Sequence, residues 1–365
     1  MAGQDFLDNM AVVIDPGSAH TKAGFSGEER PRAVVPSSAR LPAYTPGESA
    51  RDELRVCPQE HAVLVSDGPL APPVERVRTA ELLFEALGVP ALYLSHRPLL
   101  SLYSYGMVTG LVVSAGGGAT SVCPVYGGYC LPHAARTQPL GGAAVSALLQ
   151  QLLEERGSGG GVSGKGQWEA PVGGISRKSQ WEAPVGGVSG KGQWEGPVGV
   201  VSEEVQRQSV YVSQDFEREL HQGSEVTEYR LPDGTSVALG DERFRCAELL
   251  FCPSLAALPQ PGAHILALSS VAACAPQWPQ EELLANVVLS GGTTLLPGFP
   301  ERLQAELARL APRDALVRVH SGAHRHVAAW LGGSVMATLR SARPLWVTAA
   351  DYQEHGPDVV LQRCY

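Results

Sequence analysis

Two stretches of the chain share one pattern, a short apolar run, a turn of small residues and a second short run. The first reads AVVIDPGSAHTKAGFSG over residues 11–27, and the second reads LVVSAGGGATSVCPVYGGY over residues 111–129. Each predicts a hairpin, and three successive glycines, Gly116 to Gly118, allow the second tip to bend through positive φ. Such a tip presents bare backbone N–H groups, which suit a phosphate. The repeated pattern therefore predicts two related half-domains that face one cleft.

The two stretches differ most in charge. Asp15 ends the first apolar run, whereas Ser114 stands at the corresponding place in the second, and the second turn contains no acid. We therefore expect the second turn to offer a ligand only its backbone.

Length and composition limit the classes of function. The 365 residues are enough for two domains, on a usual scale of roughly 100–200 residues each. The net charge of −9 argues against a general nucleic-acid or anionic-membrane surface. The start, MAGQDFLDNM, does not resemble a secretory signal, and no apolar stretch approaches the ~18 residues of a membrane span. The seven cysteines lack zinc-site spacing and predict reduced, cytosolic thiols.

Strands alternate with helices along the chain, which predicts an α/β fold with helices on the sheet faces. A third turn of small residues, Ser290 to Thr294, follows a buried strand expected at residues 287–289. The pattern also predicts one helix from Ser202 to Leu220 and a last helix from His326 to Ser341. Gly332 and Gly333 lie inside the last helix, where each costs roughly 1 kcal/mol against alanine, so they indicate close approach of another backbone.

Residues 161–199 are of another kind. They form three consecutive 13-residue repeats, GVSGKGQWEAPVG, GISRKSQWEAPVG and GVSGKGQWEGPVG. Their glycine and proline content is typical of a disordered insertion. The alternative is a multivalent tether, in which each Trp-Glu pair makes a weak contact and copy number increases avidity.

Three glycine-bearing turns that converge from separate strands are what an ATP cleft between two lobes requires. In these turns, and in further blocks that keep the same order, the chain resembles the actin family. The further blocks are ELRVCPQEH (53–61), SLYSYGMVTG (101–110), YRLPDGTSVALGDERFRC (229–246), VVLSGGTTLLPG (287–298) and AWLGGSVMATL (329–339). Within the family it looks like a divergent actin-like protein of the germ-cell, or testis, type.

The resemblance implies an α/β, actin-like ATPase fold of the actin, Hsp70 and hexokinase type. Two related lobes would lie around a cleft, with one small subdomain largely missing. The implied segments are an outer lobe (1–38, 53–104 and 328–365), a short loop in place of the missing subdomain (39–52), an inner lobe (105–140 and 260–327) and a small subdomain (141–259) that contains the repeats.

The resemblance also implies ATP or ADP, with Mg²⁺ or Ca²⁺, in the cleft. Asp15 matches the family acid that holds the cation through water. The other positions that match the nucleotide-binding turns are Gly17, Ser18, Lys22, Gly116, Gly118, Gly141, Gly291 and Gly292. Ala19 stands where the family has a glycine.

The departures from the family lie at positions that take part in ATP hydrolysis. Arg97 replaces the glutamine that orients the attacking water, and Ser114 and Gly117 replace two acids. Beside the base and ribose, the changed positions are Gln206, Arg207, Leu296 and His326. Because such groups each contribute orders of magnitude, we expect no catalytic residue, little ATPase activity, and nucleotide binding that is weak or absent. Arg97 either neutralises phosphate charge without a metal or pairs with a nearby carboxylate.

The surfaces that build a filament in the family are altered, because loop 39–52 and the repeats replace parts of both small subdomains. We therefore expect no conventional filament. The family's apolar groove for partner helices is matched by Tyr103, Gly106, Gly128, Leu331, Val335, Met336 and Leu339. The helical spacing of Leu331, Val335 and Leu339 is also that of a plain core stripe; if exposed, the stripe suits an amphipathic helix.

The preferred interpretation is a cytoplasmic, cytoskeletal or scaffold protein that binds protein partners, not nucleic acid or membrane, and has lost hydrolysis and filament assembly. One alternative is a weakly active ATPase that binds ATP and Mg²⁺ in the cleft. A less favoured one is a subunit of a chromatin complex, for which no basic feature argues.

Overall fold

A computed structural model describes residues 9–37, 54–158, 205–230 and 236–364. It divides into two units, residues 1–144 with 261–365, and residues 145–260. The predictions for loop 39–52, for the repeats at 161–199 and for the first residues of the helix expected from Ser202 lie outside the described residues.

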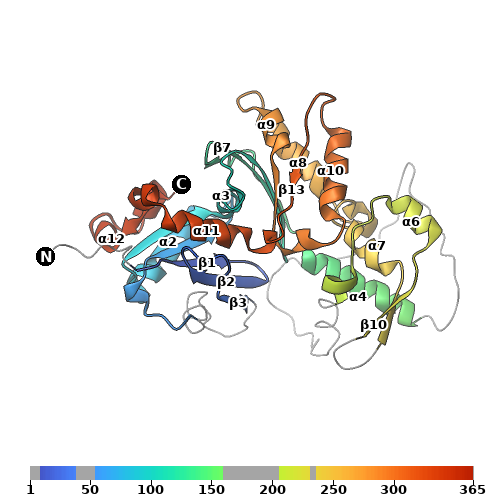
Figure 1. Ribbon diagram of the computed structural model, residues 1–365, viewed down its shortest axis with the longest axis horizontal. Helices are drawn as coiled ribbons and strands as arrows, with labels where there is room; N and C mark the ends of the chain where they lie inside the picture. Colours follow the sequence, from blue (N-terminus) through green and yellow to red (C-terminus); the bar gives the residue numbers. More distant parts are fainter. Residues whose placement is uncertain (1–8, 38–53, 159–204, 231–235, 365) are drawn as a thin grey trace. The chain divides into compact units, whose positions relative to one another are not determined.

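The first unit contains two mixed sheets, and both are built around a hairpin. The first sheet has the order β14-β5-β4-β1-β2-β3, in which β1 runs antiparallel to β2 and parallel to β4 (Figure 1). Its strands are β1 (Val12–Pro16), β2 (His20–Phe25), β3 (Ala33–Pro36), β4 (Val63–Asp67), β5 (Ala91–His96) and β14 (Val347–Thr348).

The second sheet repeats this arrangement. It has the order β13-β12-β6-β7-β8, in which β6 runs antiparallel to β7 and parallel to β12, and β9 also pairs with β7. Its strands are β6 (Gly110–Ala115), β7 (Thr120–Tyr126), β8 (Tyr129–Cys130), β9 (Arg136–Gln138), β12 (Val287–Ser290) and β13 (Val319–His320). The α/β fold class with two related sheets is therefore confirmed.

Two helices meet between these elements, α3 (Arg97–Tyr103) and α11 (Ala328–Thr338), which lie side by side (Figure 1). A Cβ on Gly332 would lie 1.7 Å from the carbonyl oxygen of Leu100, so only glycine allows the helices to come this close. The close approach predicted from the paired glycines is confirmed. The fully buried Trp330 then donates its Nε1–H to the carbonyl of Val13, at 3.0 Å, and fixes α11 on β1.

Further helices complete the first unit. They are α2 (Pro73–Glu81), which continues as a π-turn (Leu82–Ala86), α8 (Ala263–Ala272), α9 (Gln280–Ala285), α10 (Phe299–Leu310), α12 (Ala349–His355) and α13 (Val359–Arg363). The helix α4 (Gly142–Ser158) begins at the end of the first unit and continues into the second.

The second unit also contains α6 (Phe216–Gln222), α7 (Glu242–Glu248) and a hairpin of β10 (Thr227–Arg230) and β11 (Ser236–Leu239). The single helix expected from Ser202 to Leu220 is wrong, because the helical turn after Val205 ends before Val210. Asp215 then begins a new helix, since its carboxylate accepts the backbone N–H of Arg218. An aspartate in this position stabilises the start of a helix, because it accepts a backbone N–H that has no partner within the helix.

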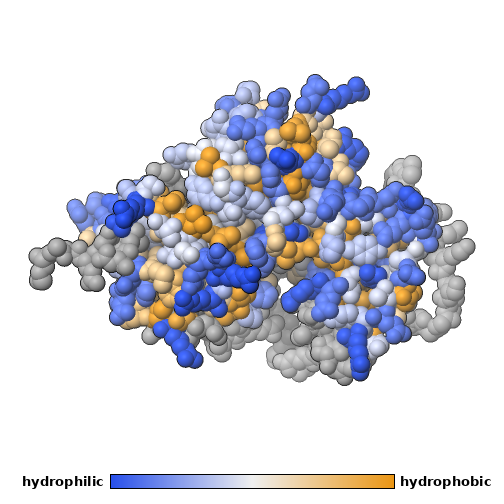
Figure 2. Space-filling model, in the orientation of Figure 1, coloured by the Kyte–Doolittle hydropathy of each residue, from blue (hydrophilic) through white to orange (hydrophobic). Residues whose placement is uncertain are grey.

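The surface mixes polar and apolar residues. On the face in Figure 2, hydrophilic residues are interspersed with smaller apolar areas. Among the described residues, no helix is long and apolar enough to cross a membrane. All seven cysteines are free thiols, as the sequence predicted.

Candidate functional site

The two hairpins have the same turn. The pair Pro16–Thr21 closes the first turn and the pair Ala115–Thr120 closes the second. In each turn the first glycine donates its N–H back across the turn, from Gly17 to His20 at 3.1 Å and from Gly116 to Ala119 at 2.9 Å. The sequence predicted the hairpins correctly, but the expected positive φ at Gly116, Gly117 and Gly118 is wrong, because none of them adopts it.

Close contact between the turns explains the second set of glycines. A Cβ on Gly117 would lie 2.8 Å from the Cβ of Ala19, which is closer than such atoms approach. The N–H of Gly118 donates to the Oγ of Ser18 at 2.9 Å. Glycine is therefore required here for the approach of the first turn, and Ala19 fits because position 117 has no side chain.

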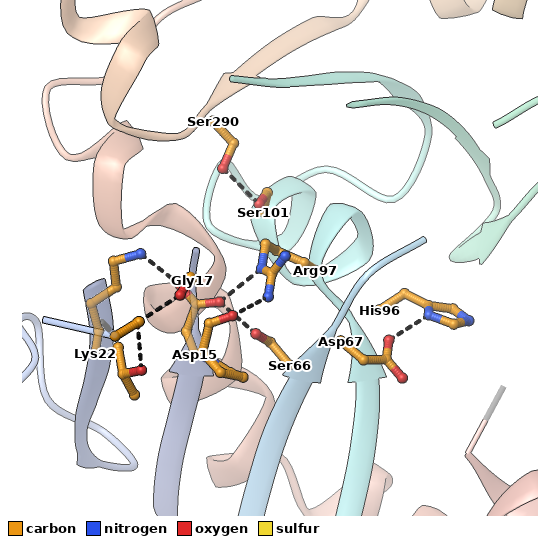
Figure 3. A network of polar contacts seen from close by, with 12 residues as sticks. Asp15, Gly17, Lys22, Ser66, Asp67, His96, Arg97, Ser101 and Ser290 are labelled. Carbon is orange, nitrogen blue, oxygen red and sulfur yellow. Dashed lines mark hydrogen bonds and ion pairs between the residues drawn. The ribbon is translucent and has the colours of Figure 1, made fainter. Parts of the chain in front are cut away.

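Asp15 lies in β1 directly before the first turn and is buried, with only 2% of its surface exposed. Its Oδ1 accepts hydrogen bonds from Ser66 Oγ (2.5 Å) and Arg97 Nε (2.9 Å), and its Oδ2 accepts one from Lys22 Nζ (3.0 Å) (Figure 3). Arg97 also donates from Nη2 to the carbonyl of Pro16, at 2.6 Å. Of the two uses expected for Arg97, the structure shows pairing with a carboxylate.

These contacts keep Asp15 ionised. Burial alone would raise the pKa of Asp15, but the charges of Arg97 and Lys22 and the hydrogen bonds from Ser66 and Arg97 hold it well below its usual range. One carboxylate is thus matched by two cations, and the network carries a net positive charge.

The second turn is held by backbone groups instead. The carbonyl of Gly116 accepts hydrogen bonds from the N–H of Gly142 at 3.0 Å and from the Thr293 hydroxyl at 2.8 Å. The carbonyl of Gly117 accepts the N–H of Ala143 at 2.8 Å. A Cβ on Gly141 would lie 2.4 Å from the Gly116 oxygen, so this glycine permits the contact.

The two glycines after β12 have different roles. Gly291 has a φ of +91°, and a Cβ there would lie 2.3 Å from the carbonyl oxygen of Ala115. Gly292 has open space around the position of a Cβ. Only Gly291 is therefore required by the close packing of the third turn on the second.

A second ionic cluster lies beside Asp15 at the ends of β4 and β5. Asp67 accepts from His96 Nδ1 at 2.6 Å and lies 2.8 Å from Arg76 Nε, an ion pair not aligned as a hydrogen bond (Figure 3). Burial would lower the pKa of His96, but the hydrogen bond and charge of Asp67 raise it above the usual value. A cavity of about 250 Å³ lies here, and its wall includes Ser66, Asp67, Glu75, Arg76, Thr79 and Arg97.

Sequence reasoning missed two polar partners, Ser66 and Thr293. Ser66 directly follows Val65, which pairs with Ile14 in the parallel strands β4 and β1, so it lies beside Asp15 near the end of β4. The signal was available, because polar residues at the ends of neighbouring parallel strands gather at one sheet edge. Thr293 was part of the third turn, but the carbonyl of Gly116 that it binds could not be inferred from the sequence.

The residues expected around the base belong to different units. Gln206 belongs to the second unit, where its Oε1 accepts from Ser146 Oγ at 2.5 Å. Leu296 is buried in the first unit, and His326 is exposed there. Desolvation lowers the pKa of His326, and the charges of Lys22, His324 and Arg325 lower it further.

The residues expected to line a partner groove divide into exposed and buried ones. Val335 and Leu339 are 43% and 45% exposed, whereas Met336 is buried in the core of the first sheet. Leu331 is half-buried and packs on that core. Of the two glycines in this set, a Cβ on Gly128 would lie 3.3 Å from the Tyr103 hydroxyl, and Gly106 has open space. The stripe is thus partly core and partly exposed.

A divalent cation does not fit this site. Every oxygen of Asp15 already accepts from a cationic side chain, and Ser114 and Gly117 supply no carboxylate. Among the described residues, no three His, Cys, Asp or Glu side chains gather as they would around a metal ion.

Comparison with known proteins gives the family. A model of the actin family matches residues 6–49 and 44–365. The chain belongs to the actin family. This actin-family chain is 33% identical to human actin-like protein 7B over 97% of its own length and 88% of the relative's. It is 31% identical to human actin-like protein 7A, and 35% identical to the protein of that name from Macaca fascicularis, in both cases over 97% of this chain and 84% of the relative.

Proposed function

We propose that this actin-family protein is a cytoskeletal or scaffold protein that does not hydrolyse ATP and acts by binding protein partners. One observation carries the proposal: Asp15 is the only acid of the two facing turns, and Arg97 and Lys22 neutralise it. Hydrolysis in this family needs acids near the cation and a side chain that orients water. Here Arg97 stands at the water-orienting position and donates to a carboxylate.

The test is a phosphate-release assay on the full chain with ATP and Mg²⁺, beside a conventional actin. We expect release no faster than in buffer. Release that Asp15→Ala abolishes would overturn the proposal and favour a weakly active ATPase, for which the retained glycine framework and Lys22 give some support. Sedimentation of the same samples tests filament assembly, which we expect to be absent.

Protein binding is proposed from the exposed apolar side chains of the α11 end, Val335 and Leu339. An amphipathic helix of the kind that docks in the actin groove is the partner type that suits them. A labelled helical peptide from an actin-binding protein should bind the full chain, and Val335→Asp with Leu339→Asp should abolish binding. Val74→Asp is the matched control, because Val74 is 60% exposed on α2. Equal binding by all variants would contradict the assignment of this surface.

A cytoplasmic, cytoskeletal location belongs to the same proposal. Immunofluorescence of the tagged full chain, compared with stained actin filaments, tests it.

A further inference from the structure

We propose that Arg97 takes the place of the divalent cation in this protein, so that the facing turns bind the phosphates of a nucleotide without metal. Nucleotide binding and nucleotide turnover are separate properties. Although this proposal rests on the same carboxylate as the proposed function, each can therefore fail without the other.

Asp15 has no free oxygen to give to a cation. Arg97 Nε lies 2.9 Å from Oδ1 and Lys22 Nζ lies 3.0 Å from Oδ2, and Ser66 adds a hydrogen bond to Oδ1. Mg²⁺ keeps several waters and is usually held by one or two carboxylates, directly or through those waters. To enter here it would have to displace a guanidinium or an ammonium group from a buried carboxylate. Such a pair is costly to break, because it leaves a buried charge unpaired.

The charge that remains at the first turn is positive. The carboxylate of Asp15 balances one of its two cations, so the first turn keeps one positive charge. The neighbourhood is also cationic on the side of Lys22, since Lys22 acts together with Arg325 and His324 to disfavour protonation of His326. A positive site repels a divalent cation and attracts a polyphosphate.

The two turns also offer hydrogen-bond donors to a phosphate. A Cβ on Gly17 would lie 3.4 Å from Lys22 Nζ, so the ammonium group lies directly against the first turn. The backbone N–H groups of Ser18 and Gly117 donate to no partner among the residues that the structure describes. The Ser18 hydroxyl accepts from the Gly118 N–H and keeps its own proton to donate to a phosphate oxygen. Hydrogen bonds from such charged and backbone donors are the usual means of holding phosphate.

Arg97 supplies what the cation would otherwise supply, which is positive charge next to the phosphates. Its Nε and Nη2 are fixed by Asp15 and by the Pro16 carbonyl, and its Nη1 has no partner within the described part of the chain. The guanidinium is therefore held rigidly with one amino group to spare. Its side chain is 28% exposed, so a ligand can reach it. Arg97 acts here as a binding residue and takes no chemical step.

The experiment is calorimetric titration of the full chain with ATP, once in excess EDTA and once in excess Mg²⁺. We expect binding in EDTA that is at least as tight as in Mg²⁺, because the site supplies its positive charge without a metal and Mg²⁺ lowers the charge of the ATP that it binds. Arg97→Gln should weaken binding in EDTA by about 10- to 100-fold, the loss expected for one hydrogen bond to a charged group. The same variant should now bind ATP more tightly with Mg²⁺ than without it.

Two controls keep the result clear. Arg340→Gln removes one exposed positive charge outside the Asp15 network and should leave binding unchanged. If Arg97→Gln does not fold, the thermal midpoint of the unmodified chain should still rise with ATP in EDTA, and Lys22→Gln should reduce that rise. Binding that requires Mg²⁺, or no binding in either condition by a folded chain, would overturn the proposal. Phosphate release measured in the same Mg²⁺ samples reports separately on the proposed function.

Discussion

The two hairpins of the first unit have one backbone plan and two different means of holding it. Each pairs with an antiparallel neighbour and a parallel one, and each closes with the same N–H bond across the turn. The corresponding positions hold Asp15, Lys22 and Ser66 in the first sheet and Ser114, Ser121 and Ser290 in the second.

The first hairpin is held by charge, and the second by the absence of side chains. Asp15 ties its turn to Lys22 and Arg97, whereas the carbonyls of Gly116 and Gly117 accept from the backbone and from Thr293. A turn can therefore keep its geometry after its acid is lost, provided that glycine contacts replace the ionic ones. The backbone of the second hairpin therefore matches that of the first, although its turn carries no acid.

The largest effect is expected from a substitution that removes the ion pairs of the first hairpin only. Asp15→Asn leaves two cations without a partner and should lower the free energy of unfolding by about 3–5 kcal/mol, measured by urea denaturation. The equivalent change in the second hairpin, Ser114→Ala, should cost less than about 1 kcal/mol, because Ser114 is half-buried and uncharged. Adding Arg97→Gln to Asp15→Asn should restore part of the loss. Equal losses at both positions would show that charge does not distinguish the hairpins.

The glycine-held hairpin is tested by adding one methyl group. Gly291→Ala combines a φ of +91° with an overlap of 2.3 Å on the Ala115 oxygen, so it should cost about 2–4 kcal/mol. Gly292→Ala, the adjacent residue, meets nothing within 4 Å and should change stability by less than about 0.5 kcal/mol. Thermal denaturation of both variants provides the comparison. A stable Gly291→Ala protein would mean that the third turn does not pack on the second as described.

A variant with an acid in the second turn tests the contact between the two turns. Gly117→Asp places a Cβ 2.8 Å from that of Ala19 and should cost about 1–2 kcal/mol. Ala19→Gly removes that contact, so the double variant should recover most of the loss in urea denaturation. A strictly additive double variant would show that the two turns do not touch.

The smallest effect concerns pH. The folded-state pKa of His96 lies above its usual 6.5, so its pairing with Asp67 stabilises the fold fully below pH 6.5 and is lost as pH rises through the folded pKa. Denaturation of the unmodified chain and of His96→Gln should therefore differ most at acidic pH and converge at alkaline pH. Ser101→Ala, which breaks the hydroxyl pair of Ser101 and Ser290 beside the second hairpin, should show no such dependence on pH. A difference for His96→Gln that grows with pH would contradict the sign.

Local patterns in the sequence were enough for the hairpins, the α/β class and the close helix pair at Gly332. Apolar runs around small residues specify strands and turns without distant partners, and a glycine pair inside an apolar helix indicates that another backbone lies against it. The family resemblance suggested the positions of Asp15 and Arg97 and the absence of a second acid; the comparisons confirm the family itself.

Tertiary structure decided what those residues do. Arg97 lies 82 residues from Asp15 in the chain, and the sequence alone did not show that its guanidinium pairs with this carboxylate. The choice depends on the register of β1, β4 and β5, which ends three strands at one edge and brings Asp15, Ser66 and Arg97 together. The glycines of the second turn were likewise expected for positive φ, but their reason is the approach of Ala19. Local propensity determines which shapes a segment can adopt, whereas the charge and space around a side chain are set by segments that only the fold brings near it.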